Sequence, residues 1–246
     1  MSLVIYADFN CPWSYLASRR IDALAAAGVE ADWRAVEADP RLPVTGQRLT
    51  ADGRAALQQE LSAVAGLLLP GEELPSRLPD LIPKTEAAVS GYAEAYGAGV
   101  GADVRRLLFA AYWLEGADIG DPNVLRTRLA GPILRGHSTA DPLREAGFAV
   151  SVNRGPITTS AWRRVRAWRD EWNRLGRPAL PVLLADGEPP ASGEESLRRL
   201  EKELARLGAP LNPELPDPAR YPAPTVRPAR EWVSRVGGPW AYAWMG

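Results

Sequence analysis

The fold is decided by Asp8-Phe9-Asn10-Cys11-Pro12-Trp13-Ser14-Tyr15-Leu16-Ala17, where a strand gives way to a helix. Residues 2–8 form a short apolar run rich in β-forming residues, which predicts a buried strand. From Pro12 onward the apolar residues recur at helical spacing, and Gly28 is placed to end the helix. Residues 29–36 alternate between apolar and polar, the pattern of a half-buried strand. A strand, a helix and a strand of these lengths predict a βαβ unit with parallel strands.

The next block, residues 50–147, is mostly helical in pattern. Breaks that contain glycine or proline separate its candidate helices, which cover residues 51–69, 84–96, 102–116 and 122–134. This arrangement indicates a helical block inserted after the βαβ unit.

A second α/β stretch follows the helical block. Residues 159–175 form the clearest amphipathic helix of the chain, and Ser160 can cap its first turn. An apolar strand at 180–185 leads through an Asp-Gly turn to a partner strand at 188–192, the strongest hairpin signal of the sequence. Residues 194–207 predict a last helix.

The C-terminal segment, residues 208–246, is rich in proline and tryptophan. It is too aromatic for a solvated linker. We expect an extended tail that wraps the domain or a partner subunit.

The composition is that of a globular protein with ample core, since 46% of the 246 residues are hydrophobic and 24% are charged. With a formal net charge of -1, the chain has no excess of positive charge that would attract nucleic acid or an anionic membrane. No stretch approaches the roughly 18–20 consecutive apolar residues of a membrane span, and the first residues lack the features of a secretion signal. We therefore expect a cytoplasmic protein without nucleic-acid or membrane partners.

The sequence contains one cysteine, Cys11, and one histidine, His137. A single thiol cannot form an internal disulfide or a cysteine-rich metal site, and a single histidine excludes a histidine-rich one, so we expect no metal. His137 could act as a general base near neutral pH, but its place before an expected helix start favours a surface or capping role.

Cys11 is the candidate reactive group. It lies at the first turn of the expected helix, where unpaired backbone N–H groups and the positive end of the helix dipole favour a thiolate. Such a position can lower the pKa of a cysteine to between ~3.5 and ~7.5. The alternative is a buried, inert thiol, since free cysteine is among the most buried residue types.

A proline, Pro181, stands at the start of the apolar strand, where an interior proline is normally excluded. A cis peptide bond between Leu180 and Pro181 would let the chain present backbone polar groups to a ligand instead of a neighbouring strand. An edge-strand proline without a role is the alternative, and the sequence alone does not decide between the two.

The order of these elements resembles the DsbA-like branch of the thioredoxin fold. The Cys11 segment is similar to the active-site turn of FrnE-like dithiol oxidoreductases, 2-hydroxychromene-2-carboxylate isomerases and kappa-class glutathione transferases. Three further stretches match: residues 83–85 with the helix after them, residues 108–121, and residues 180–182 with 186–187.

The resemblance covers about residues 1–207 and implies an α/β, thioredoxin-like fold with a helical insertion. Residues 1–49 and 155–207 would form the thioredoxin-like domain. Residues 50–154 would form the insertion domain, and residues 208–246 the proline- and tryptophan-rich tail.

Departures from the family pattern bear on the function. The oxidoreductases carry Cys-X-X-Cys, whereas Ser14 replaces the second cysteine here, so Cys11 cannot cycle through an intramolecular disulfide. The isomerases and transferases carry serine where this chain has Cys11. Lys84 replaces the asparagine usual before Thr85, and Gly193 stands where the kappa class offers an acid to the amino group of glutathione.

The resemblance also implies the site residues. Cys11 would form a mixed disulfide with glutathione or hold its thiolate, and Ser14 would hydrogen-bond the sulfur. The backbone of Leu180 would bind the cysteinyl part of glutathione, and Ser192 with a helix N-terminus would hold the γ-glutamyl carboxylate. The candidate catalytic residues are thus Cys11 and Ser14, and the candidate binding residues are Asn10, Pro12, Trp13, Leu180, Pro181 and Ser192.

Three functions stay open. The first is a glutathione-linked oxidoreductase, transferase or isomerase that uses a single cysteine and acts on a small-molecule thiol or electrophile. The second is a DsbA-like protein disulfide oxidoreductase or isomerase that acts on protein disulfides through mixed disulfides. The third is a thioredoxin-fold binding module without activity. The aromatic tail would suit a homodimer in each case.

Overall fold

The computed structural model describes residues 3–136, 147–150, 156–209 and 211. His137 and almost all of the expected tail, residues 208–246, lie outside the described residues, so what the sequence predicts for them stays a prediction. Within the described ranges, no helix is both long and apolar enough to cross a membrane.

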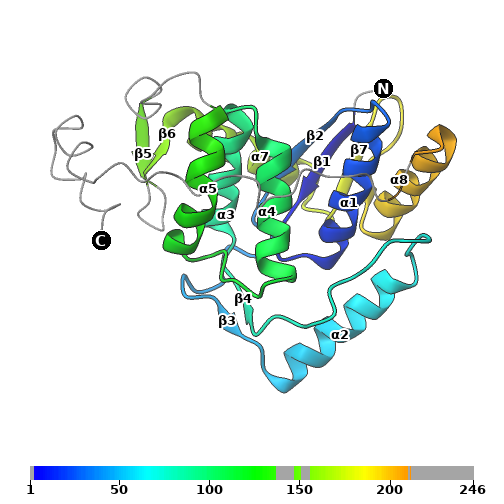
Figure 1. Cartoon of the computed structure of the whole chain (residues 1–246), viewed down its shortest axis with the longest axis horizontal. Coiled ribbons are helices and arrows are strands. Elements are labelled where there is room, and N and C mark those ends of the chain that lie inside the picture. Colours follow the sequence, from blue (N-terminus) through cyan, green and yellow to red (C-terminus); the bar gives the residue numbers. More distant parts are fainter. Residues whose placement is uncertain (1–2, 137–146, 151–155, 210, 212–246) are drawn as a thin grey trace, which may run out of the picture.

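A four-stranded sheet forms the centre of the fold, with the strand order β2-β1-β7-β8 (Figure 1). Its strands are β1 (Leu3–Ala7), β2 (Ala31–Ala35), β7 (Val182–Ala185) and β8 (Ala191–Ser192). β1 and β2 run parallel and are joined by helix α1 (Pro12–Ala26), which confirms the predicted βαβ unit. β7 pairs antiparallel with β8, which confirms the predicted hairpin.

The register of β1 against β7 brings two distant turns together. The two strands are antiparallel, with Leu3 opposite Ala185 and Tyr6 opposite Val182. The residues that follow β1 and the residues that precede β7 therefore lie at the same edge of the sheet. Cys11 and Leu180 meet at this edge.

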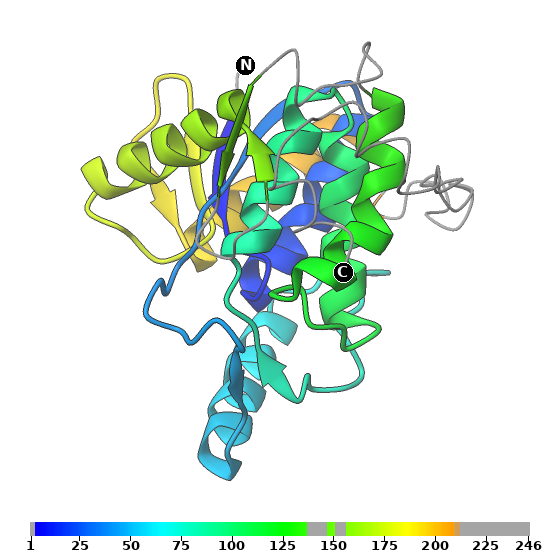
Figure 2. The ribbon, with the colours of Figure 1, turned by 90° about the vertical axis from the view of Figure 1, so that its left-hand side faces the viewer.

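Helices pack around the sheet and extend to one side of it. α1 packs against α8 (Glu194–Leu207), and α3 (Glu86–Gly97) packs against α7 (Thr159–Arg174). α3, α4 (Gly101–Trp113) and α5 (Pro122–Gly136) form a bundle beside the sheet (Figure 1). α2 (Ala51–Ala65) projects away from this bundle, at the bottom of both ribbon views (Figures 1 and 2).

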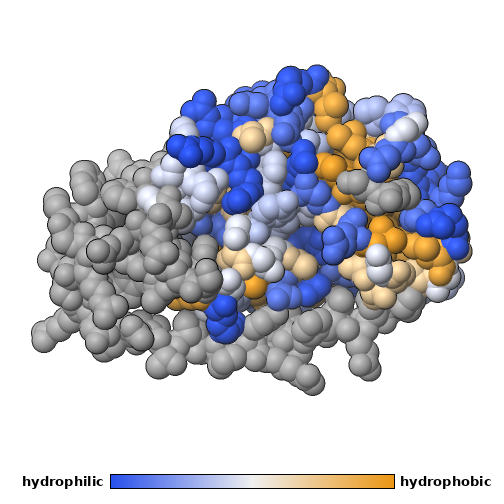
Figure 3. Space-filling view, turned by 90° about the horizontal axis from the view of Figure 1, so that it is seen from above, coloured by the Kyte–Doolittle hydropathy of each residue, from blue (hydrophilic) through white to orange (hydrophobic). Residues whose placement is uncertain are grey.

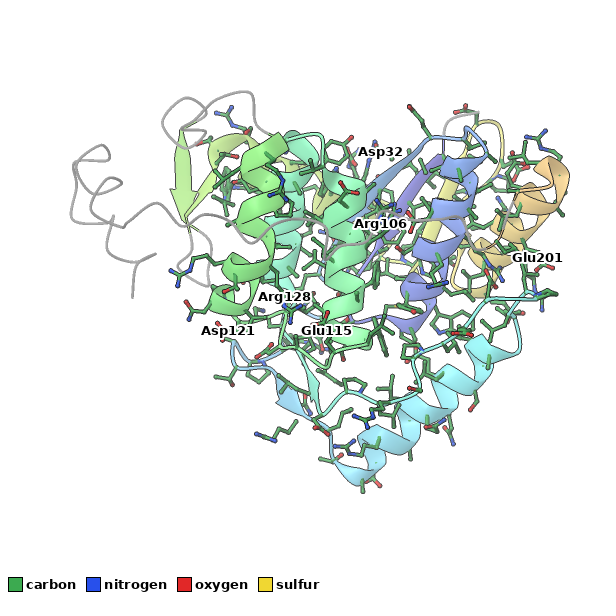
Figure 4. All side chains as sticks on the ribbon, viewed as in Figure 1. Asp32, Arg106, Glu115, Asp121, Arg128 and Glu201 are labelled. Atoms are coloured by element: carbon green, nitrogen blue, oxygen red, sulfur yellow. The ribbon has the colours of Figure 1, made fainter. Side chains whose placement is uncertain are left out.

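At the lower end of the bundle, an ion pair links the end of α4 to α5. Glu115, just after α4, and Arg128 of α5 lie side by side in Figure 4, and their charged atoms are 2.6 Å apart.

The opposite end of the molecule, where β1 begins, has a mixed surface. Polar and charged residues cover much of its described part, and hydrophobic residues gather on the side of α1 and α8 (Figure 3).

Two small sheets were not predicted. β3 (Gln47–Arg48) pairs with β4 (Leu81–Ile82), and β5 (Phe148–Val150) pairs with β6 (Pro156–Thr158). Strands of two or three residues are too short to show an alternating pattern in the sequence.

The predicted cap of α7 is also wrong. Thr158, not Ser160, caps this helix, because its hydroxyl accepts a hydrogen bond from the N–H of Ala161 at 3.1 Å. Both residues have the chemistry of a cap, and the helix begins one residue after Thr158.

One aromatic cluster joins the βαβ unit to the helical block. The ring of Phe109 in α4 lies 5.1 Å from Phe9, 6.0 Å from Tyr15 and 5.8 Å from Trp33, between ring centroids. All four side chains are buried. The Trp113 indole N–H also donates to the Phe9 carbonyl oxygen at 3.0 Å. The hydrophobic core is therefore continuous between the two parts of the chain.

A buried ion pair ties α1 to the segment after α2 and to α8. Arg20, 1% exposed, donates to both carboxylate oxygens of Glu72 at 2.9 and 2.8 Å. Its terminal nitrogens also donate to the carbonyl oxygens of Leu67 and Leu197. Sequence reasoning missed this arrangement, because a charged residue in a helix is almost always exposed unless it is paired.

Replacing Arg20 with methionine should lower the free energy of unfolding by about 3–5 kcal/mol, because Glu72 would stay buried without its partner. Equilibrium unfolding in urea measures the loss. Arg198→Ala is the matched control, since Arg198 pairs with Glu194 at 2.6 Å on the surface, where a pair contributes about 0–1 kcal/mol. Equally small effects of the two changes would contradict the role given to Arg20.

Candidate active site

Cys11 lies at the junction of β1 and α1. It is the N-cap residue of α1, with φ −94° and ψ 122°, and Pro12 is the first residue of the helix. Its N–H donates to the Asp8 carbonyl oxygen at 3.3 Å, which closes the turn. Its sulfur lies 3.8 Å from the Leu180 carbonyl oxygen, a weak S–H···O hydrogen bond. The residue is partly exposed to solvent.

The peptide bond between Leu180 and Pro181 is cis. Pro181 directly precedes β7, which lies between β1 and β8, so the edge-strand alternative is wrong. The Pro181 carbonyl oxygen accepts hydrogen bonds from the Gly193 N–H at 2.9 Å and from the Ser196 hydroxyl at 2.8 Å. The Leu180 carbonyl oxygen, one residue earlier, faces the Cys11 thiol.

A cleft of about 1120 Å³ opens over Cys11. Six of the eight sequence-predicted site residues line it: Asn10, Cys11, Pro12, Trp13, Leu180 and Ser192. The other two, Ser14 and Pro181, are buried and do not line the cleft. The unpredicted part of the lining comes from segments 38–41 and 177–179, from Glu60 and Trp172, and from Gly193-Glu194.

Burial raises the pKa of the Cys11 thiol to about 12. Hydrogen bonding from the side chain and N–H of Ser14 lowers this pKa, but burial dominates. The expectation of a pKa lowered by the helix N-terminus is therefore wrong. A helix dipole contributes about 0.3–1 kcal/mol, which is less than one pKa unit and cannot offset the burial. A raised pKa favours the neutral thiol, and the Cys11 S–H can donate a hydrogen bond.

Side chains from two other parts of the chain hold the wall formed by segment 38–41. The Ala38 N–H donates to the Asp8 carboxylate at 2.7 Å, and the Arg177 guanidinium donates to the Ala38 carbonyl oxygen at 2.8 Å. The backbone of this wall is thereby linked to the Cys11 turn and to the segment before β7.

Lys84 holds the same wall from a third direction. Its ammonium donates to the Pro40 carbonyl oxygen at 2.5 Å and pairs with Glu37 at 3.0 Å. Lys84 is 6% exposed, and it stands where the resembled proteins have asparagine. Its role could not be read from the sequence, because segment 37–40 lies more than forty residues away.

The start of α8 forms another part of the cleft. Ser192 is exposed there, and Gly193 is the N-cap residue with φ 54° and ψ −123°. A positive φ of this kind favours glycine, which accounts for the absence of an acid at this position. Glu194 in the first turn pairs with Arg198 at 2.6 Å, one turn later in the helix.

Glu60 brings α2 to the cleft. Its carboxylate accepts a hydrogen bond from the Trp13 side chain, and burial raises its pKa. Only Leu61 and Val64 of α2 are buried, so this helix contributes Glu60 to the cleft lining with few core contacts. Glu60 belongs to no recognisable motif, and sequence reasoning missed it.

Alkylation of Cys11 by iodoacetamide should accelerate about tenfold for each pH unit between pH 7 and pH 10, because the thiolate fraction grows steadily below a pKa of about 12. The intact mass of the protein reports the rate directly, since the chain has no other thiol. A rate that levels off below pH 8 would show instead that the helix N-terminus stabilises the thiolate.

Asp8→Asn should remove a pH dependence of stability. Burial raises the pKa of Asp8 from 3.8 to about 6, although hydrogen bonds from the Ala38 N–H, Thr85 and the Phe9 N–H lower it. The folded state therefore binds this proton more tightly than the unfolded state, and the wild type loses stability relative to the variant as pH rises through 6. The full difference corresponds to about 3 kcal/mol.

Urea unfolding of both proteins at pH 4 and pH 7 measures this dependence. The asparagine side chain does not titrate, so changes common to both proteins cancel in the comparison. A stability difference that stays constant between the two pH values would refute the assignment to Asp8.

One family model matches this chain. The model of the DSBA-like thioredoxin domain matches residues 2–130, just over half of the chain. No curated protein matches the sequence. The matched residues include β1, α1 and the Cys11 turn.

Solved structures share the fold at low sequence identity. A probable DsbA oxidoreductase from Streptomyces coelicolor is 22% identical, with a TM-score of 0.59 over 88% of this chain and 94% of that one. The cytosolic disulfide reductase DsbM from Pseudomonas aeruginosa, solved with GSH, is 18% identical, with a TM-score of 0.55 over 83% of this chain and 100% of that one. A 2-hydroxychromene-2-carboxylate isomerase is 18% identical, with a TM-score of 0.51 over 85% of this chain and 96% of that one.

These likenesses confirm the thioredoxin-like DsbA fold that the Cys11 segment and the element order indicate. The chain belongs to the family of DSBA-like thioredoxin domains.

Proposed function

We propose that this protein is a glutathione-linked thiol enzyme: an oxidoreductase, a transferase or an isomerase. Cys11 supplies the one thiol of its active site. The observation that carries the proposal is the contact of the single thiol of the chain with the Leu180 carbonyl oxygen, at 3.8 Å in a cleft of about 1120 Å³. The structure of DsbM with GSH, on a similar fold, supports glutathione as the ligand.

The lone thiol limits the chemistry that the site can perform. A dithiol oxidoreductase closes an intramolecular disulfide, and this step needs a second thiol. Ser14 occupies the corresponding position and is fully buried. The site can therefore support glutathione chemistry or mixed disulfides, but not a self-contained dithiol cycle.

The neutral state of Cys11 favours a role as hydrogen-bond donor. Because burial raises the pKa of Cys11, the thiol rather than the thiolate is the favoured form at pH 7. Glutathione would bind as its thiolate, stabilised by the Cys11 S–H and by the N–H groups at the start of α1. The glutathione sulfur, rather than Cys11, would then attack a small electrophile.

The cleft has room for glutathione and a second molecule. A site for one small molecule typically has a volume of about 300–1,000 Å³, which this cleft exceeds. The cysteinyl part of glutathione would lie along Leu180, with its γ-glutamyl carboxylate near Ser192 and the start of α8. The space beside Trp13 and Glu60 would admit the second substrate.

The same proposal includes a reducing, cytoplasmic setting, in which a free thiol persists. The similar DsbM is described as cytosolic. Within the described residues, no group of three or more histidine, cysteine or acidic side chains could hold a metal ion. A homodimer formed through the C-terminal segment is a further part of the proposal.

Titration of bound glutathione tests the role of Cys11. The ultraviolet absorbance of the thiolate should show that binding lowers the pKa of the glutathione thiol by about one unit or more, the equivalent of about 1.4 kcal/mol. Cys11→Ser keeps a donor at this position and should keep most of the shift, whereas Cys11→Ala should lose most of it.

Two other results would contradict the proposal. Rapid formation of a protein–glutathione disulfide from oxidised glutathione at pH 7, seen as a mass gain that Cys11→Ala lacks, would contradict the donor role of Cys11, because the glutathione-linked enzyme would then work through a mixed disulfide of this thiol. Calorimetry that detects no binding of glutathione to the wild type would favour the binding module.

A further inference from the structure

The loop between α7 and β7 contains an unusual backbone conformation. Arg177 has a φ of +53°, and it is the one non-glycine residue in the described parts of the chain with a positive φ. The left-handed region is disfavoured for a residue with a Cβ and is kept where the surrounding structure or the function requires it. Gly176, directly before it, also has a positive φ, +85°, but glycine adopts this conformation without strain because it has no side chain. The arginine side chain therefore needs its own explanation.

The side chain of Arg177 spans two walls of the cleft. Its guanidinium lies 4.9 Å from the centroid of the Trp172 ring and donates to the Ala38 carbonyl oxygen at 2.8 Å. All three residues line the cleft. The stacking and the hydrogen bond fix the plane of the guanidinium. An arginine has five N–H donors, so this one bond leaves others for a ligand.

Charge pairing distinguishes Arg177 from the other cation of the cleft. Arg41 also lines the cleft, but its guanidinium pairs with Asp39 at 2.9 Å. Among the residues that the structure describes, Arg177 has no carboxylate partner. It is thus the cation that an anionic ligand group can reach without displacing a carboxylate of the protein.

The position of Arg177 also matches the proposed orientation of glutathione. Arg177 precedes Leu180 by three residues, so their Cα atoms are at most about 11 Å apart. With the glutathione sulfur at Cys11 and its γ-glutamyl end at Ser192, the glycine end points away from Ser192. The remaining wall, formed by segments 38–41 and 177–179, contains Arg177.

We infer that Arg177 binds the glycine carboxylate of glutathione. The inference rests on the proposed function and adds a specificity-determining residue to it. The planar guanidinium matches a carboxylate with two parallel N–H···O bonds, which a lysine cannot form. The positive φ thus occurs at a residue that lines the cleft and has a role there.

Arg177→Gly is the informative variant, because glycine accepts the positive φ while the guanidinium is removed. The variant should fold normally and keep a melting temperature close to that of the wild type. By calorimetry, the wild type should bind glutathione about tenfold more tightly than glutathione ethyl ester, whose glycine carboxylate is blocked. Arg177→Gly should bind both about equally, at the weaker level. Arg177→Lys keeps the positive charge but lacks the paired N–H donors of the guanidinium, so its preference for glutathione over the ester should lie between those of the wild type and Arg177→Gly.

Each other outcome is decisive. If Arg177→Gly weakens glutathione and its ester by the same factor, Arg177 only holds the cleft walls and the inference is wrong. If the wild type binds both ligands equally, the inference is wrong while the proposed function stands. If the wild type binds neither ligand, the proposed function fails and the inference fails with it.

Discussion

The antiparallel register of β1 against β7 is the constraint on which the site depends. It places the turn after β1 opposite the turn before β7, so that Cys11 and Leu180 meet although 169 residues separate them in the sequence. A slip of one residue would turn the side chains of a strand to the opposite face of the sheet. The buried contacts of Phe9 with Phe109 and Trp113 add a second restraint, because they hold the Cys11 turn against the helical block.

Two opposing effects act on the sulfur at this turn. The start of α1 favours a negative charge, whereas burial disfavours it, and burial is the larger effect at Cys11. The same competition acts on Asp8, whose pKa is raised although it accepts backbone hydrogen bonds. The Cys11 turn thus combines a thiol and a carboxyl group whose pKa values are both raised, in each case because burial disfavours the charged form.

Local patterns in the sequence predicted much of the fold and part of the site. The βαβ unit, the hairpin and the helix at 194–207 follow from periodicity and turn residues. Cys11 follows from its place at the start of the expected helix, and the role of Leu180 follows from the family resemblance. The remaining features depend on contacts between distant segments. Lys84 reaches Pro40, and Arg177 reaches Ala38, contacts that no window of the sequence contains. The prediction of a lowered Cys11 pKa was wrong for the same reason, because the burial that raises this pKa comes from the tertiary fold.

Helix α2 is anchored differently from the rest of the molecule. It buries only Leu61 and Val64, and the buried pair of Arg20 and Glu72 fixes the chain just after it. One face of the cleft thus rests on an element that contributes little to the stability of the sheet. Under the proposed function, substitutions on that face, around Glu60, would alter which second substrate is accepted while the fold and the thiol site persist. The lining contributed by α2 can therefore change in evolution with little effect on the stability of the fold.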